Sequence, residues 1–573
     1  MTDTTRVQAA ISTSRVTRQG HGGDLAVAVA RAHGITAMFT LSGAHVFPLY
    51  DAAVREGSGM TLVDVRHEQT AVFAAEATAK LTRVPGLAVL TAGPGVTNGI
   101  SAVTGAWFNG SPLLVLGGRA PDYRWGTGTL QELDQPPLLA SITKLAETVH
   151  ETAAIPARVD AALTTAATPH RGPVFLDVPM DVLYDRAEAA VPAPAPREAV
   201  APDPDALAAI ADLVVQALHP VLVLGSDVWL DGAGHAARRL AETLRLPVIA
   251  NGMGRGVLPR GHELLVTRAR SRVLAGADLV IVAGAPLDFR LGYGSFGGRP
   301  GTEGQQAAPA RVVHLADSPG QVATHVALAG SAAGDLTLVL DGLRGAWERH
   351  PAAPAQTATA TGWLTTVQAA TLAAVERDRV VLGADTDPIH PARVYGELLP
   401  RLEPDAVVIG DGGDFVSFAG KYVEPAAPGG WLDPGPYGCL GAGLGAAIAA
   451  RLARPAAQVV LLLGDGAAGL SLMDVDTLVR HRLPVVMVVG NNGVWGLEKH
   501  PMRMLFGYDV AADLAPGTRY DEVVRALGGA GETVTKPGEI GPALDRAFAS
   551  GVPYLVNVLT DPEVAYPRAT TGI

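Results

Sequence analysis

Residues 459–466 read VVLLLGDG and residues 485–492 read VVMVVGNN, so two apolar runs each end at a short polar signal. Short, wholly apolar strands are typical of parallel sheets that are covered on both faces. The carboxyl ends of parallel strands lie along one edge of their sheet, and ligands of open α/β sheets bind at that edge. We therefore expect Asp465 and Asn492 to lie together at a ligand-binding edge.

The side chains at these two strand ends favour a metal-diphosphate site. Carboxylate and amide oxygens are hard ligands of the kind that Mg²⁺ prefers, and a backbone carbonyl with diphosphate oxygens would complete an octahedron. Gly464 and Gly466 let the backbone approach phosphates, and the following helix presents its N-terminus to negative charge. A GDG run alone is common in tight turns, but its combination with a second strand and Asn-Asn indicates a binding site.

Short apolar runs alternate with amphipathic stretches along the whole chain. We expect strands at residues 37–41, 61–65, 87–91, 113–117 and 174–178, then at 221–224, 247–250, 279–283 and 311–315, and finally at 406–409, 459–463, 485–489 and 554–558. Strands that alternate with helices in this way predict an α/β fold with doubly wound parallel sheets.

Domain borders are indicated by two stretches rich in Pro and Ala. These stretches, residues 187–205 and 350–362, lack apolar periodicity and look like linkers. A chain of 573 residues is also too long for one hydrophobic core. We predict a flexible N-terminus at 1–22, domains at 23–186, 206–349 and 386–573, and linkers at 187–205 and 350–385.

The composition argues against several classes of protein. A net charge of −12 without a basic run argues against nucleic acid as a partner. The apolar runs, such as residues 459–463, are far shorter than the roughly 20 residues that span a bilayer, which argues against a membrane protein. Cys439 is the only cysteine, so a disulfide within the chain is excluded and we expect a cytoplasmic location.

The GDG run followed by Asn-Asn resembles the GDG…NN motif of thiamine-diphosphate enzymes. The resemblance implies thiamine diphosphate as the cofactor, with Mg²⁺ bound by the side chains of Asp465 and Asn492 and by the carbonyl of Val494. It extends over about residues 20–565 and implies pyrimidine-binding, central and diphosphate-binding domains in that order. It also implies a homodimer or homotetramer, because the two halves of the site come from different subunits in this family.

A second motif of the family occurs in the first domain. Residues 65–70 read VRHEQT and resemble the family's "HE" element, with GPGVTN at 93–98 as the matching downstream context. The resemblance makes Glu68 the glutamate that activates the cofactor through its aminopyrimidine ring. The alternative is a glutamate that opens a helix and interacts only with the helix dipole.

The run PYGCLGAG at residues 436–443 resembles the family's G-x-hydrophobic-G element. It implies that Leu440 is the wedge beneath the bent cofactor, and that the Gly438 carbonyl and the Leu440 N–H bind the pyrimidine. A core leucine in a Gly-rich turn is the alternative, and Cys439 is interpreted as a small packing residue. The resemblance assigns further cofactor contacts to Gly43, Ala44, Pro94, Asn98, Gly413, Asp414, Phe415, Gly464, Gly466, Ala467, Trp495, Gly496 and Leu497.

Three local features bear on the branch of the family. Residues 491–499 read NNGVWGLEK and resemble pyruvate decarboxylases, in which a glutamate after the Asn pair lies above the thiazolium. Glu498 would take this place and transfer a proton to or from the substrate. Acetolactate synthases carry an aliphatic residue there, and their substrate-selecting tryptophan falls at Pro501. A solvated Glu498 paired with Lys499 is the alternative.

The other two features favour different branches. Residues 119–142 lack the paired histidines of pyruvate decarboxylases and, with Gln131, resemble acetolactate synthases. Residues 268–289 resemble the oxalyl-CoA decarboxylase and 2-hydroxyacyl-CoA lyase branch, although Pro286, Asp288 and Phe289 depart from its pattern. This branch binds a nucleotide in the central domain, so phosphate partners are expected at Arg268, Arg270 and Arg272. Plain surface charge is the alternative, and the nucleotide is left open between ADP, FAD and CoA alone.

Two histidines are further candidates. His45 lies in the loop that faces the thiazolium in relatives, where it would bind a substrate oxygen, relay a proton or serve only as a structural imidazole. His500 is a candidate of the same kind.

The leading hypothesis is a lyase that cleaves, or in reverse forms, 2-hydroxyacyl-CoA, with formyl-CoA and an aldehyde or ketone as the other species. An acetolactate synthase-like carboligase that acts on pyruvate and an oxalyl-CoA-type decarboxylase are the alternatives among enzymes. A non-catalytic cofactor-binding subunit is the alternative outside them.

Overall fold

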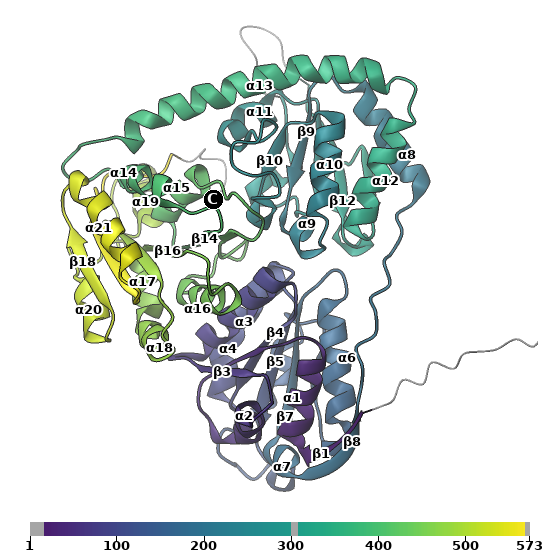
Figure 1. Ribbon diagram of the computed structural model, residues 1–573, viewed down its shortest axis with the longest axis vertical. Helices are drawn as coiled ribbons and strands as arrows, with labels where there is room; N and C mark the ends of the chain where they lie inside the picture. Colours follow the sequence, from purple (N-terminus) through teal and green to yellow (C-terminus); the bar gives the residue numbers. More distant parts are fainter. Residues whose placement is uncertain (1–15, 299–307, 568–573) are drawn as a thin grey trace, which may run out of the picture.

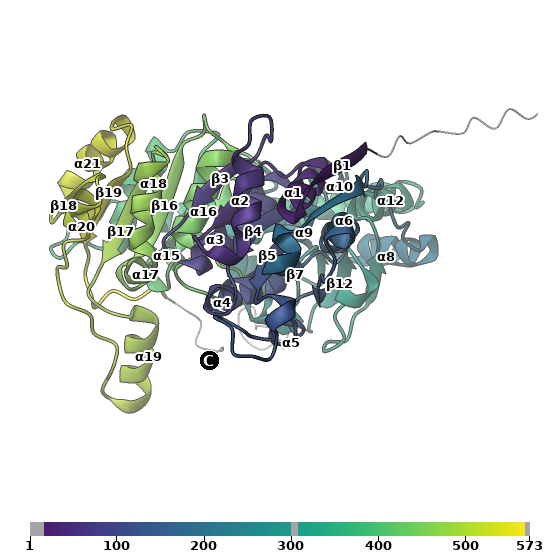
Figure 2. The ribbon, with the colours of Figure 1, turned by 90° about the horizontal axis from the view of Figure 1, so that it is seen from below.

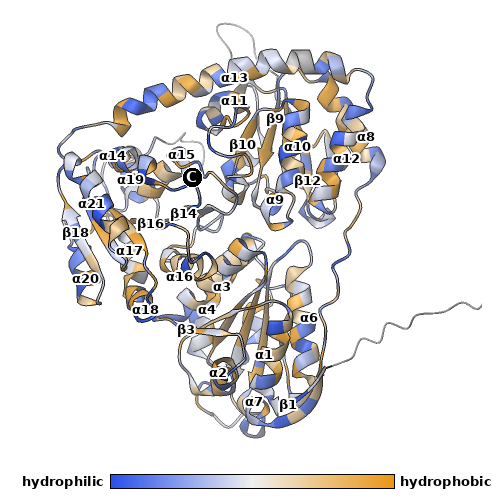
Figure 3. Cartoon of the chain, in the orientation of Figure 1, coloured by the Kyte–Doolittle hydropathy of each residue, from blue (hydrophilic) through white to orange (hydrophobic). Residues whose placement is uncertain are grey.

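The computed structural model describes residues 16–298 and 308–567. Within these residues, three parallel sheets follow one another along the chain, each with helices on both faces (Figure 1). The sheet strands are mostly hydrophobic, and hydrophilic residues gather on the outer faces of the helices (Figure 3). The predicted fold class of three consecutive α/β domains is therefore confirmed. No helix in the described parts of the chain combines the length and the apolarity needed to cross a membrane.

The first domain contains six parallel strands in the order β3-β2-β4-β5-β7-β6. They are β2 (Ala37–Thr40), β3 (Thr61–Asp64), β4 (Gly86–Leu90), β5 (Leu113–Arg119), β6 (Ala146–Thr148) and β7 (Pro173–Pro179). Their helices are α1 (Gly22–Ala32), α2 (Phe47–Val54), α3 (Glu68–Thr82), α4 (Pro94–Phe108), α5 (Pro136–Leu139), α6 (Ile155–Ala167) and α7 (Met180–Tyr184). The strand order reverses between β2 and β4, so a ligand-binding crevice is expected at their carboxyl ends.

The central domain contains five parallel strands in the order β10-β9-β11-β12-β13. They are β9 (Pro220–Leu224), β10 (Val248–Ala250), β11 (Leu279–Ala283), β12 (Arg311–Ala316) and β13 (Gly330–Ala333). Their helices are α8 (Pro204–Gln216), α9 (Ser226–Leu230), α10 (Gly234–Leu244), α11 (Arg270–Gly276) and α12 (Leu336–Glu348). Here the order reverses between β9 and β11.

The third domain contains six parallel strands in the order β15-β14-β16-β17-β19-β18, which is the same succession as in the first domain. They are β14 (Val407–Asp411), β15 (Trp431–Leu432), β16 (Val459–Gly464), β17 (Val486–Asn491), β18 (Ala530–Val534) and β19 (Tyr554–Leu559). Their helices are α14 (Pro391–Leu398), α15 (Asp414–Tyr422), α16 (Gly443–Ala453), α17 (Asp465–Ser471), α18 (Val475–Arg480), α19 (Gly496–Phe506), α20 (Tyr520–Ala526) and α21 (Pro537–Ala549). The crevice of this sheet lies between β14 and β16.

The structure contradicts part of the prediction for each of the three segments that were expected to be flexible. Residues 16–21, expected in the flexible terminus, form β1 (Val16–His21), which pairs antiparallel with β8 (Arg186–Val191). The expected linker 187–205 therefore begins as a strand. Most of the expected linker 350–385 is one helix, α13 (Ala353–Leu382), because a proline is tolerated in a first helical turn and alanine favours the rest. Residues 1–15 lie outside the described structure.

The domains are held together by α13 and by a shared core. Asp378 on α13 accepts from Arg268 of the central domain at 2.6 Å and from Lys421 of the third domain at 2.7 Å. Helices α3 and α16 pack together, so buried residues of the first and third domains form one hydrophobic cluster (Figure 1). The helix that begins at Glu68 is thereby fixed against the third domain.

Candidate cofactor site

A cavity of about 460 Å³ lies at the carboxyl ends of β14, β16 and β17, where the third sheet reverses its strand order. Its lining includes the predicted residues Gly413, Asp414, Phe415, Gly438, Leu440, Gly464, Asp465, Gly466, Ala467, Asn492, Val494, Trp495, Gly496, Leu497 and Glu498. The central domain adds Asn251, Gly252, Arg255, Phe289 and Arg290, of which the sequence motifs singled out only Phe289. The third-domain residues predicted for the cofactor therefore lie around one cavity.

Asp465 is held firmly at the start of α17. Its two carboxylate oxygens accept the N–H groups of Gly466 at 2.9 Å and Gly493 at 2.6 Å. Burial raises the pKa of Asp465 to about 6, against the opposing effect of these backbone hydrogen bonds. Asn492 lines the cavity, whereas Asn491 donates to the Thr518 carbonyl at 2.9 Å beneath it. Of the Asn pair, Asn492 is thus the residue in position to bind a ligand.

The backbone around this carboxylate leaves no space for side chains. A Cβ atom on Gly466 would lie 2.5 Å from the Trp495 ring, and Gly412 approaches the Gly464 backbone with a φ of +142°. The first turns of α15 and α19 also line the cavity and present backbone N–H groups to it. Oxygen ligands beside glycine backbone and helix N-termini fit Mg²⁺ and a diphosphate.

The Gly-rich turn before α16 forms another part of the wall. Gly438 and Leu440 line the cavity, and Gln69 donates to the Leu440 carbonyl at 3.3 Å. The half-buried thiol of Cys439 has a pKa raised to about 11 by burial, so it stays protonated at neutral pH. A protonated thiol is a poor nucleophile, which agrees with a packing role.

Glu498 lies in the first turn of α19, a helix that projects from the body of the third domain (Figure 2). Lys499, the partner of Glu498 in the alternative interpretation, is buried, and its ammonium contacts Asp513 at 2.5 Å. His500 does not line the cavity, and its Nε2 is buried without a hydrogen-bond partner in the described structure. Of these neighbours, Glu498 is the one that the structure brings to the cavity.

Glu68 begins α3, the helix that follows β3 after a short turn, and is only 6% exposed. The His67 ring caps the helix by accepting the Gln69 N–H at 3.1 Å. Asn98, near the start of α4, donates to Glu68 Oε2 at 3.0 Å, and Pro94 begins that helix. The structure therefore places Glu68 and Asn98 in contact at the starts of α3 and α4.

The predicted residues that follow β2 lie in the same crevice of the first sheet. His45 Nδ1 lies 3.2 Å from Thr91 Oγ1 at the end of β4, and burial lowers the pKa of the imidazole. A Cβ on Gly43 would collide with Thr91, which explains the glycine before Ala44. Gln131 lies against Gly93 in the same crevice. The His45 imidazole is therefore neutral at physiological pH.

The two sets of residues do not line a common cavity within one chain. Among the described residues, none that lines the third-domain cavity comes from the first domain, so neither Glu68 nor His45 lies in it. A ligand that needs both Glu68 and Asp465 cannot be enclosed by this cavity alone.

Three family models match the chain in the order of its sheets. The N-terminal TPP binding domain of thiamine pyrophosphate enzymes matches residues 20–138, the central domain residues 207–343, and the C-terminal TPP binding domain residues 411–558. The chain belongs to the thiamine pyrophosphate enzyme family. Thiamine pyrophosphate and thiamine diphosphate are one compound, so the cofactor predicted from the motifs is confirmed for this enzyme.

Curated relatives of the enzyme carry two different names. The chain is 49% identical to the acetolactate synthase large subunit IlvG of Mycobacterium tuberculosis over 96% of this chain and 97% of the relative. It is 35% identical to 2-hydroxyacyl-CoA lyase 2 of Caenorhabditis elegans over 90% of this chain and 84% of the relative. The human 2-hydroxyacyl-CoA lyase 2 is 33% identical over 94% of this chain and 90% of the relative.

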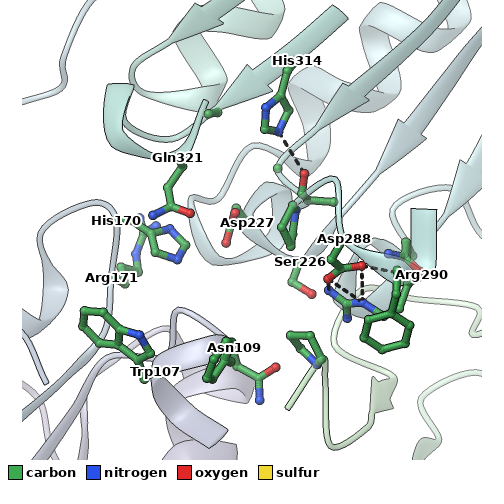
Figure 4. Close-up of a pocket in the computed structure, with 18 of the residues that line it drawn as sticks. Trp107, Asn109, His170, Arg171, Ser226, Asp227, Asp288, Arg290, His314 and Gln321 are labelled. Carbon is green, nitrogen blue, oxygen red and sulfur yellow. Dashed lines mark hydrogen bonds and ion pairs between the residues drawn. The ribbon is translucent and has the colours of Figure 1, made fainter. Parts of the chain in front are cut away.

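A second cavity in this thiamine-diphosphate enzyme, of about 530 Å³, lies between the first and central domains (Figure 4). Strand ends of β9, β11 and β12 supply one wall, and Trp107, Asn109, Lys144, His170 and Arg171 of the first domain supply another. Asn251, Phe289 and Arg290 line both cavities, so the two are neighbours. Part of its wall belongs to the stretch 268–289 that the sequence singled out for a nucleotide, namely Gly284, Ala285, Pro286, Asp288 and Phe289. The rest of the wall comes from distant segments, which sequence motifs did not indicate.

This second cavity, called the central cavity from here on, lies among side chains of both charges. Arg171 pairs with Asp231, and His170 Nδ1 lies 3.0 Å from Asp317. Burial raises the pKa of Asp227 to about 7. Lys144 donates to two backbone carbonyls, and burial lowers its pKa to about 8. Cationic side chains are thus present, but carboxyl groups lie among them.

The arginines expected at a nucleotide do not line this cavity. Arg268 is tied to Asp378 on α13, and Arg270 donates to the Arg290 carbonyl at 2.5 Å. Arg272 is exposed on α11. The run of three arginines looked like a phosphate cluster in the sequence, but Arg268 joins the central domain to α13 and Arg270 bonds within the central domain. Any anion in the central cavity would instead meet Lys144, Arg171 and Arg290.

Proposed function

We propose that this enzyme cleaves, or in reverse forms, the carbon–carbon bond of 2-hydroxyacyl-CoA, with formyl-CoA and an aldehyde or ketone as the other species. The observation that carries the proposal is Glu498 in the wall of the cofactor cavity, in the first turn of α19. A carboxylate at this place suits a reaction in which a substrate hydroxyl loses a proton. Relatives named 2-hydroxyacyl-CoA lyase 2 support the same assignment.

The residues of the cavity divide into two roles under this proposal. Asp465, Asn492 and the Val494 carbonyl would hold Mg²⁺, and Gly438 with Leu440 would hold the pyrimidine. Glu68 of a second copy would meet the ring, since no described first-domain residue lines the cavity within one chain. When bound, thiamine diphosphate supplies a nucleophilic carbon and an electron sink. A homodimer or homotetramer follows from this division of the site.

Glu498 is proposed to accept the proton of the substrate 2-hydroxyl and to return a proton to the reacting carbon. His45 would remain a neutral hydrogen-bonding group, because burial lowers its pKa. The neighbouring cavity, with Lys144, Arg171 and Arg290, is the proposed place of the CoA nucleotide. Trp107, Phe108 and Phe289 offer apolar rings in its wall.

Replacing Glu498 by Gln should lower turnover of a 2-hydroxyacyl-CoA about 100-fold, because a positioned proton carrier contributes on this order. Affinity for thiamine diphosphate should not change, because the variant keeps the metal ligands. The measurement is kcat at saturating cofactor, with titration of the cofactor beside it. Glu522→Gln, a surface change on α20 in the same domain, is the control and should retain full activity. Near-normal turnover by Glu498→Gln would reject the proposed role.

An acetolactate synthase is the second candidate, because the Mycobacterium tuberculosis relative of that name is 49% identical over nearly the whole chain. Incubation of the holoenzyme with pyruvate alone and with a 2-hydroxyacyl-CoA alone separates the two functions. Formation of formyl-CoA from the thioester would support the lyase. Formation of acetolactate from pyruvate, without cleavage of the thioester, would reject the lyase in favour of an acetolactate synthase.

A further inference from the structure

Asp411 ends strand β14 at the crevice of the third sheet, and its side chain is wholly buried. One carboxylate oxygen accepts the N–H of Gly441 at 3.1 Å, and the other accepts the N–H of Gly443 at 2.7 Å. Both glycines belong to the turn that carries Leu440 and leads into α16. A single carboxylate thus joins the end of a central strand to the turn in the cavity wall.

The turn fits tightly over the strand end. A Cβ on Gly443 would lie 2.8 Å from Asp411 Cβ and 2.7 Å from Leu461 Cδ1, so only glycine allows this approach. Gly441 has a φ of +85°, a conformation that side chains disfavour. The Leu440 carbonyl is held from the first domain by Gln69 at 3.3 Å. Asp411 and Gln69 therefore fix the turn from two sides.

The carboxylate has no cationic partner among the described residues. Burial raises the pKa of Asp411 to about 6, and its opposing interactions are the two backbone N–H groups. Charge-assisted hydrogen bonds to backbone N–H are stronger than neutral ones, and the N-terminus of α16 favours a negative charge as well. The geometry of the turn and the ionisation of Asp411 therefore depend on each other.

We propose that Asp411 is a positioning residue, which sets the height of Leu440 beneath the cofactor without touching the cofactor itself. The inference rests on the proposed roles of Gly438 and Leu440. Without both hydrogen bonds, the turn would no longer be held at one position over β14. A cofactor that must bend over Leu440 would then bind less tightly and in a less defined conformation.

The test is Asp411→Asn, which keeps the shape but supplies only one acceptor oxygen. Removing a charge-assisted hydrogen bond should weaken thiamine diphosphate binding by about 10- to 100-fold, as measured by titration in excess Mg²⁺. The near-ultraviolet circular dichroism of the bound cofactor should also weaken at saturation. This second readout reports the conformation of the cofactor, which loss of stability alone does not change.

The matched control is Asp521→Asn, since Asp521 is equally buried in the same domain but binds Arg519 and Thr533. This variant should lower the melting temperature and leave the cofactor titration and spectrum as in the wild type. Wild-type binding and spectrum in folded Asp411→Asn would overturn the inference. If Asp411→Asn does not fold, Asp411→Glu keeps the charge and displaces the turn by one methylene, and the same two readouts apply. A wild-type protein that binds no thiamine diphosphate would instead reject the proposed cofactor site.

Discussion

Turnover should fall by roughly 10²- to 10⁴-fold when Glu68 is replaced by Gln, because a proton-transferring carboxyl group contributes on this order. The glutamine can keep the hydrogen bond from Asn98, now 3.0 Å from Glu68 Oε2, so the start of α3 should stay in place. The amide cannot exchange a proton with the aminopyrimidine ring. The measurement is kcat at saturating Mg²⁺ and cofactor, with exchange of the cofactor C2 proton for deuterium as a direct readout.

Glu76→Gln is the control for this experiment, because Glu76 lies on the same helix two turns further on. Glu76 binds Lys80, Asn109 and Ser111 in a buried network, so its loss should lower stability. Its kcat should remain that of the wild type. A Glu68→Gln enzyme that exchanges the C2 proton at the wild-type rate would remove Glu68 from the reaction.

The second large effect is expected for Asp465→Asn. The change removes the only negative charge among the proposed metal ligands, and the amide cannot accept from both Gly466 and Gly493. Mg²⁺-dependent binding of thiamine diphosphate should weaken by more than about 100-fold, which exceeds the usual cost of losing a group behind a metal ligand. Titration calorimetry with the cofactor in excess Mg²⁺ measures the change.

Asp474→Asn provides the comparison for this variant. Asp474, a buried residue nine positions after Asp465, binds Thr70 and the Arg66 N–H of the first domain. Its replacement therefore affects the contact between the first and third domains. Its cofactor affinity should stay within a few-fold of the wild type. Equal losses in the two variants would indicate general unfolding and contradict a ligand role for Asp465.

The main strands could be predicted because they are short, apolar and buried on both faces, as β16 and β17 are. Several strands at or near the sheet edges were missed, whereas β3 and β10 at other edges were predicted. All residues of β6 and most residues of β18 are only partly buried, both strands contain polar residues, and β15 has two residues, so no apolar run marks them. The apolar run that marks a strand in the sequence reflects the burial of that strand, and these edge strands lack such a run.

The site could be predicted as far as its residues follow strands in the sequence. Asp465 and Asn492 occupy the ends of neighbouring strands, so strand order alone brings them together. The central cavity lies where the first and central domains pack together, beside the contact of His170 with Asp317. No local sequence pattern predicts how two domains pack. The prediction of a linker at 350–385 was wrong because a stretch rich in Pro and Ala can form a helix with proline in its first turn as well as a loop.

The identical strand order of the first and third sheets gives the chain two crevices of one form. Thiamine diphosphate has two unlike ends and, under the proposed arrangement, would need one crevice from each of two copies. Binding of the cofactor and association of the two copies then become thermodynamically linked. Dilution of the protein and removal of the cofactor would both favour dissociation of the same cofactor-bound dimer. Loss of activity on dilution would accordingly be slowed by added thiamine diphosphate.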